Sequence, residues 1–282
     1  MQLFRARNIN FPMLINGVLQ RPYDGFSTIM LQESGATSIY HSFQVSAQQR
    51  FATGSSFLAA YTLGKAIDDA ASNSTRYYTN ATGDPQNLRG SRGLSDFDRT
   101  HRLVVSYNQE VPNPFGANAS GAAKIFSGWE LSGITTIQSG TPFSVTNAQS
   151  NLDHDGQAGA PGTGGRADAV IGVEPVNPGP NSDKLNNYLN PAAFAPAPRS
   201  RFGTLGRNTI RGPGSNLWDL RVSKITPIGE RWRLRFITEF FNTWNHPAFG
   251  NPGSVLATPG FGTIRSTLSN ARIIQFALKL EY

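Results

Sequence analysis

RIIQFALKLEY, at residues 272–282, alternates over its last nine residues between large apolar side chains and small or polar ones. The alternating apolar set is Ile274, Phe276, Leu278, Leu280 and Tyr282, and Gln275, Lys279 and Glu281 lie between its members. Successive side chains of a β-strand point to opposite faces, so a period of two places this apolar set on one face. The segment is therefore predicted to be a strand with one apolar and one polar face.

The same alternation recurs along the chain. RWRLRFITEFF (231–241) separates Trp232, Leu234 and Phe236 from a row of arginines, and HRLVVSYNQEV (101–111) repeats the pattern. Together these segments predict about eight strands, at 26–33, 36–50, 54–65, 100–111, 124–138, 217–226, 231–242 and 274–282.

The connections between these strands alternate in length. Short turns follow 36–50, 100–111 and 217–226, whereas long loops are predicted at 65–99, 139–215 and 243–270. Two-faced strands of about 9–11 residues joined by alternating short turns and long loops are typical of outer-membrane barrels. The sequence predicts an all-β, antiparallel transmembrane barrel segment with short periplasmic turns and long extracellular loops. The alternative is a secreted β-sandwich that binds polysaccharide and packs its apolar faces on each other.

Composition excludes several other classes. The 282 residues include 29 Gly and 18 Pro, which argues against a helical bundle. They include no Cys, which excludes a disulfide scaffold and any thiolate site. No apolar run approaches the roughly 20 residues of a membrane-spanning helix. The net charge of +7 is scattered rather than clustered, which argues against a nucleic-acid partner.

Four segments together resemble a known family. They are FLAAYTLGKAIDDA (57–70), LSDFDRTHRLVVSYNQEVP (94–112), GWELSGITTIQSGTPFSV (128–145) and GFGTIRSTLSNARIIQFALKLEY (260–282). In this order they resemble the C-terminal barrel of Oar-like TonB-dependent receptors, from about residue 20 to 282. The resemblance implies a lead-in segment at 1–25 and the last strands of a larger barrel at 26–282, with the plug and the signal peptide outside this sequence.

The resemblance also implies a function and a location. It points to uptake of a bulky solute, such as a siderophore, glycan or peptide, or to a role at the cell surface, in the cell outer membrane. The implied partners are outer-membrane lipid, the barrel-assembly machinery, which reads a terminal aromatic such as Tyr282, and the TonB complex through the missing plug. No cofactor is implied.

The alternation assigns side chains to lipid or lumen. The residues expected to face lipid are Leu234, Phe236, Ile274, Phe276, Leu278, Leu280 and Tyr282. Arg233, Arg235 and Glu239 lie on the opposite face, where they either line a water-filled lumen or form a structural ladder with neighbouring strands.

Two motifs suggest chemistry but have plainer interpretations. The densest charge cluster is Asp96, Asp98, Arg99, His101 and Arg102. An acid–base pair of Asp98 with His101 is one interpretation, and a salt-bridged anchor at the extracellular strand mouth is the favoured one. Residues 151–156 imitate the start of a calcium loop, but Gly162 stands where the bidentate Glu belongs. No catalytic, metal or cofactor site is predicted, and the protein is not expected to be an enzyme.

Overall fold

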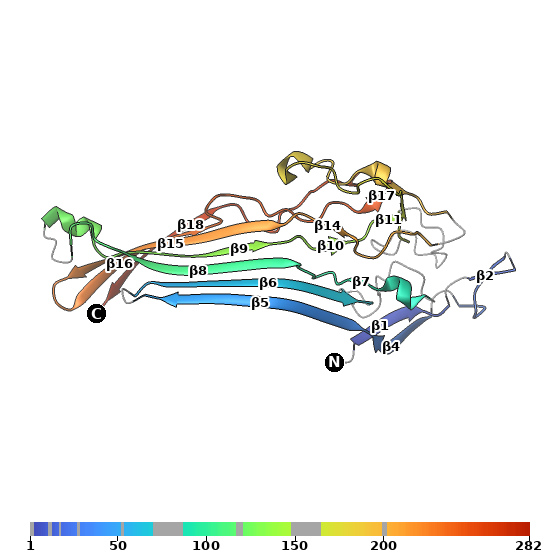
Figure 1. The fold of residues 1–282 in the computed structure, drawn as a ribbon, viewed down its shortest axis with the longest axis horizontal. Coiled ribbons are helices and arrows are strands. Elements are labelled where there is room, and N and C mark those ends of the chain that lie inside the picture. Colours follow the sequence, from blue (N-terminus) through green and yellow to red (C-terminus); the bar gives the residue numbers. More distant parts are fainter. Residues whose placement is uncertain are drawn as a thin grey trace.

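The computed structural model describes residues 3–10, 13–16, 18–26, 29–51, 54–69, 87–116, 121–147, 165–198 and 202–282. Its main feature is one antiparallel sheet (Figure 1). The long strands are β5 (Ser38–Arg50), β6 (Ser56–Asp68), β8 (His101–Val111), β9 (Trp129–Gln138), β15 (Ser215–Ile228), β16 (Trp232–Phe241) and β18 (Ile273–Glu281). They lie in the order β18-β16-β15-β9-β8-β6-β5, and the short β7 (Gly93–Leu94) pairs with the end of β6. The predicted all-β antiparallel fold is confirmed.

The strand register confirms the two-faced pattern. Directly opposite residues share a face, and Phe236 lies opposite Leu278, Leu103 opposite Ile137 and Val45 opposite Tyr61. Followed from strand to strand, these pairs place the predicted apolar sets on a single face. That face stays exposed, with Phe43 at 62%, Phe276 at 66% and Leu278 at 67% of their surface accessible. The described sheet therefore does not pack against a second sheet as a sandwich would, and the sandwich interpretation is wrong.

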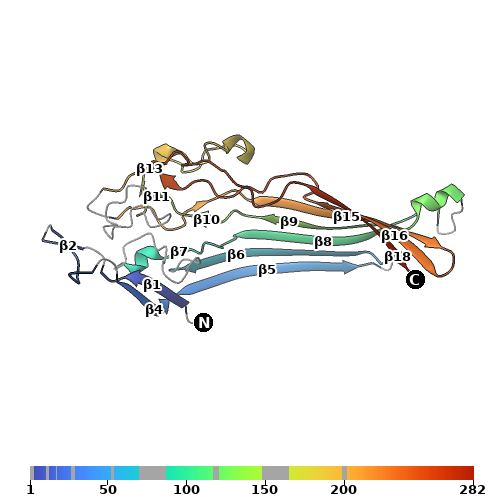
Figure 2. The ribbon, with the colours of Figure 1, turned by 180° about the vertical axis from the view of Figure 1, so that it is seen from behind.

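Short and long connections gather at opposite ends of the sheet (Figure 2). Residues 51–55, 112–128 and 229–231 connect strands at the turn end, where Gly229 adopts a φ of +64° that suits glycine. Residues 69–100, 139–214 and 242–272 connect them at the loop end. The C-terminus lies at the turn end and the N-terminus toward the loop end.

Two predicted strands differ from the structure. The strand expected at 26–33 is β4 (Met30–Ala36), which pairs with β1 (Leu3–Asn8) and not with the large sheet. The chain leaves that pairing at Thr37, whose backbone N–H donates to the Asp69 carboxylate at 2.7 Å and so fixes the start of β5. The strand expected at 124–138 begins only at Trp129, because 121–126 form a 3-10 helix, η2 (Gly121–Phe126).

The remaining elements are short. They are the strands β2 (Met13–Ile15), β3 (Val18–Gln20), β10 (Pro142–Phe143), β11 (Thr146–Asn147), β12 (Asp168–Ala169), β13 (Phe194–Ala195), β14 (Ile210–Arg211) and β17 (Val255–Leu256), and the 3-10 helices η1 (Leu88–Ser91), η3 (Asn181–Lys184) and η4 (Pro191–Ala193). None of the helices that the structure describes is long and apolar enough to span a membrane.

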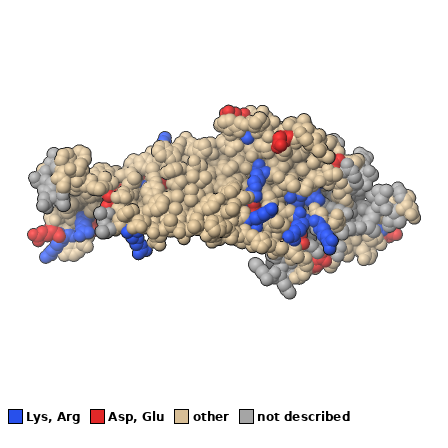
Figure 3. Space-filling model, viewed as in Figure 1, with Lys and Arg blue, Asp and Glu red and all other residues tan. Residues whose placement is uncertain are grey.

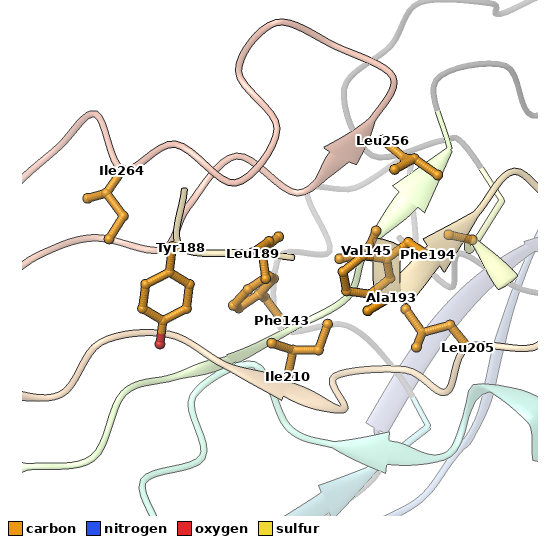
Figure 4. Packing of buried hydrophobic residues seen from close by; sticks show 11 residues of the cluster. Phe143, Val145, Tyr188, Leu189, Ala193, Phe194, Leu205, Ile210, Leu256 and Ile264 are labelled. Atoms are coloured by element: carbon orange, nitrogen blue, oxygen red, sulfur yellow. The ribbon is translucent and has the colours of Figure 1, made fainter. Parts of the chain in front are cut away.

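The principal cluster of buried apolar residues lies in the long loops rather than under the sheet (Figure 4). All its members come from the connections after β9 and β16: Phe143, Val145, Ala167, Tyr188, Leu189, Ala193, Phe194, Leu205, Ile210, Leu256 and Ile264. Short pairings tie these loops together, β10 with β14 and β11 with β17. The two long loops therefore form one packed body beyond the end of the sheet, and they present a shaped surface there.

Candidate functional site

The polar face of the sheet encloses a hollow of about 480 Å³. Its lining comes from six strands, β5, β6, β8, β9, β15 and β16, so the sheet curls around it and the polar face is concave. The lining residues are mostly polar or charged and include Gln48, Arg50, Ser106, Asn108, Ser132, Asp219, Arg221 and Glu239. This geometry places most hydrophilic side chains of these strands inside the curve of the sheet, together with Leu58, Ile134 and Phe241.

Charges of both signs lie within the hollow. Arg221 on β15 is directly opposite Glu239 on β16, and the Nε of Arg221 has no hydrogen-bond partner among the described residues. Asp219 accepts a hydrogen bond from the backbone N–H of Asn242 at 2.8 Å, which holds its carboxylate at the loop end of β15. Such a lining has both donors and acceptors for a polar solute.

The three residues assigned to the lumen all lie on this polar face, but they differ in their contacts. Arg235 donates to Glu130 on β9 at 3.2 Å and to Glu281 on β18 at 3.1 Å, so it belongs to a ladder across the sheet. Ser223 extends the ladder by donating to the same Glu130 carboxylate at 2.9 Å. Arg233 is exposed opposite Glu281, and only Glu239 of the three lines the hollow.

The residues assigned to lipid lie together on the opposite face. Phe236 and Phe276 stack at 6.2 Å, and Ile274, Leu280 and Tyr282 are 46%, 60% and 78% exposed. Figure 3 shows this face: a broad uncharged area covers the long strands, and lysines and arginines gather toward the loop end.

Aromatic rings border the apolar face at the turn end. Trp232 packs against Tyr282 at 4.8 Å, and the Lys224 ammonium lies 5.1 Å above the Trp129 ring. Aromatic side chains at this level correspond to the interfacial girdle of membrane barrels.

The predicted charge cluster connects the sheet to the loop body. Asp98 is 2% exposed, accepts a hydrogen bond from the Ala66 backbone N–H at 2.6 Å and forms an ion pair with Arg211. His101 instead hydrogen-bonds the Tyr61 hydroxyl through Nδ1 at 2.8 Å. Asp98 and His101 thus have separate partners, and these contacts favour the anchor over the acid–base pair.

Asp96 and Arg99 of the cluster also contact the long loop that follows β9. Asp96 accepts from the Asn208 side chain at 2.6 Å, and Arg99 donates to the Ser139 carbonyl at 2.6 Å. Burial, with the charges of Arg102 and Arg211, lowers the pKa of Arg99. Arg102 lies exposed at the start of β8, on the polar face.

Sequence reasoning missed the basic partners of this anchor. Arg207 pairs with the buried carboxylate of Asp68 at 2.5 Å, across 139 residues of chain, and Arg211 pairs with Asp98. The only available signal was the presence of two arginines in an otherwise charge-poor, glycine-containing stretch, 202–215. Neighbouring Asp68 and Asp69 do not form a carboxylate pair, because Asp69 binds Thr37.

Among the residues that the structure describes, no group of three His, Asp or Glu side chains lies close enough together to hold a metal ion. The calcium-like motif at 151–156 lies outside the described residues.

Comparison with known proteins agrees with this geometry. No curated protein and no solved structure matches the chain significantly. The family model described as outer membrane beta barrel domain matches residues 1–275. The apolar outer face, the polar concave face and the family match lead to one conclusion: the chain belongs to the outer membrane beta barrel domain family and is located in the outer membrane.

Proposed function

We propose that the chain is the C-terminal part of the barrel of an Oar-like TonB-dependent receptor, which takes up a bulky solute. The observation that carries the proposal is the concave polar face, with an open hollow of about 480 Å³ and charged walls. An eight-stranded barrel has an interior that side chains fill or that holds one small ligand, whereas wider barrels contain an aqueous channel or a plug. The long charged side chains of this face, Arg221, Arg235 and Glu239, favour the aqueous lumen of a wider barrel.

The edges of the sheet support the same proposal. Within the described residues, β5 pairs only with β6 along its length and β18 only with β16. An unpaired edge in hydrocarbon leaves backbone groups without partners, at several kcal/mol each. Additional strands of the same receptor, between the edges of β5 and β18, would satisfy these groups and widen the lumen.

The proposed partners follow from the faces. Lipid covers the apolar face, the assembly machinery reads β18 with Tyr282, and the TonB complex acts through a plug domain that fills the lumen. No catalytic role is proposed, and the separate partners of Asp98 and His101 support this interpretation. Cofactors and nucleic acid have no role in the proposed function.

Cysteine labelling tests the lumen assignment, because the chain contains no cysteine of its own. Ser106→Cys places a thiol in the hollow, and Phe276→Cys is the matched control on the apolar face. In outer membranes that contain the whole receptor, we expect a water-soluble maleimide to label the first and a lipid-soluble maleimide to label the second. The reverse pattern would contradict the proposal.

Uptake assays test the transport role. Cells with and without the receptor, each with and without TonB, are given a panel of ferric siderophores, oligosaccharides and peptides. We expect accumulation of one solute class that requires both proteins. Loss of cell adhesion on deletion of the receptor, without any change in accumulation, would favour a surface role instead.

A further inference from the structure

A second hollow, of about 590 Å³, opens at the loop end of β6 and has a strongly basic lining. Four of its residues are cations and none is a carboxylate: Lys65, Arg92, Arg207 and Arg211. We propose that this basic hollow binds the phosphate-bearing sugar headgroup of an outer-leaflet glycolipid. The proposal uses the outer-membrane location of the chain and does not depend on the transport role.

The position of Lys65 places the hollow at the edge of the lipid-facing surface. The apolar face of β6 runs through Phe57, Ala59, Tyr61 and Leu63, and Lys65 is the next residue on that face. From Phe57 to Lys65 the strand rises about 26 Å, at about 3.3 Å per residue. With a tilt of about 40° this corresponds to about 20 Å of membrane depth, against an apolar band about 25 Å tall. Lys65 therefore lies near the outer border of the band, at the depth of lipid headgroups.

Two of the four cations are held rigidly by buried carboxylates. The Arg207 side chain is 3% exposed and pairs with Asp68, and Arg211 pairs with Asp98, whose side chain is 1% exposed. Arg207 also donates to the Ser91 carbonyl at 3.3 Å. These contacts fix the positions of the guanidinium groups without adding a carboxylate to the lining, so the hollow is organised before any ligand binds.

The other two cations are available to a ligand. Lys65 and Arg92 are exposed and form no ion pair with any residue that the structure describes. A phosphate group accepts charge-assisted hydrogen bonds from exposed cations of this kind.

The size and the location of the hollow decide between a free phosphate ion and a phosphorylated glycolipid. A volume of about 590 Å³ falls within the range of sites for drug-sized molecules and is larger than a single phosphate ion requires. The two residues that β6 contributes to the lining, Lys65 and Ile67, lie on the apolar side of the sheet by their register, so the hollow borders that side. A phosphorylated sugar attached to acyl chains fits both observations, since its chains can lie along the neighbouring apolar surface (Figure 3).

The test measures binding of the whole receptor, purified in mild detergent, to phosphatidylcholine vesicles that contain diphosphoryl lipid A. The test variant is Lys65→Gln with Arg92→Gln, which removes two charges without touching an ion pair. The matched control is Arg233→Gln with Lys279→Gln, two exposed cations on the polar face that line neither hollow. We expect the test variant to bind about 30-fold more weakly, equivalent to about 1 kcal/mol per charge, and the control to bind like the wild type.

Other arms of the experiment separate the sources of phosphate. The wild-type receptor is expected to bind vesicles with dephosphorylated lipid A as weakly as the test variant binds vesicles with diphosphoryl lipid A. Inorganic phosphate alone is expected to compete only weakly. Equal binding of the phosphorylated and dephosphorylated lipids, full competition by free phosphate, or unchanged binding of the test variant would each overturn the proposal. An unchanged heat-modifiable gel mobility establishes that the variants are folded.

Discussion

Leu278 offers the sharpest test of the face assignment. It lies in the middle of the nine-residue strand β18, opposite Phe236, and is 67% exposed on the apolar face. An arginine on the lipid face of a barrel costs about 2–4 kcal/mol near the bilayer midplane. We therefore expect Leu278→Arg to lower the folding equilibrium constant in a bilayer by roughly 30-fold to 900-fold.

The control is an arginine on the other face of the same strand. Gln275 is exposed on the polar face directly opposite Glu239, so Gln275→Arg gains an attractive partner and is expected to change stability by less than about 0.5 kcal/mol. Ala277 is a poorer control. It is half-buried opposite Ile237, which is only 4% exposed, and an arginine there would be crowded.

The assay is unfolding by urea of the whole barrel protein refolded into phospholipid vesicles. Four tryptophans in this chain contribute the fluorescence signal. A large loss of stability for Leu278→Arg with little change for Gln275→Arg is the expected result. Equal losses for the two variants would refute the assignment of the apolar face to lipid.

Three further perturbations test the assembly of the fold. Deleting 274–282 removes most of β18, so we expect loss of outer-membrane insertion, measured by cell fractionation. Arg207→Ala leaves the buried Asp68 carboxylate unpaired, and we expect a loss of about 3–5 kcal/mol, measured by urea unfolding, with faster proteolysis of the loop body. Burial raises the pKa of Tyr188. The stability that its neutral hydroxyl contributes to the folded protein is therefore present below about pH 10 and is lost as the pH rises through the raised folded-state pKa. We expect Tyr188→Phe to make the free energy of unfolding fall less steeply at alkaline pH.

Much of the sheet followed from local pattern. The alternation in 231–241 and 272–282 predicted which side chains share a face, and the strand register bears this out across β16 and β18. The alternation of short turns and long loops was also predicted from the sequence, and the structure places the two kinds of connection at opposite ends of the sheet. Side-chain direction in a strand depends on backbone geometry alone, so a period of two can be detected without knowing which strands are neighbours.

The sequence predicted only the acidic half of the anchor between the sheet and the loops. Asp96 and Asp98 stood out as a charge cluster, yet the partner of Asp98 is Arg211, 113 residues further along the chain. The sequence places His101 closer to Asp98, but on a strand where it meets Tyr61 instead. Proximity along the chain therefore suggested a pair that the fold separates.

The sequence by itself determined the two-faced strands, their approximate ends and the class of the protein, because each of these depends on residues that are neighbours along the chain. Only the tertiary structure decided that β4 pairs with β1, that the long loops share a packed core of Phe143, Leu189 and Leu256, and that arginines from 202–215 lie beside carboxylates near β6. Those arrangements join segments far apart in sequence. Their free energy comes from burial and ion pairing between loops, and alternation within one strand carries no information about it.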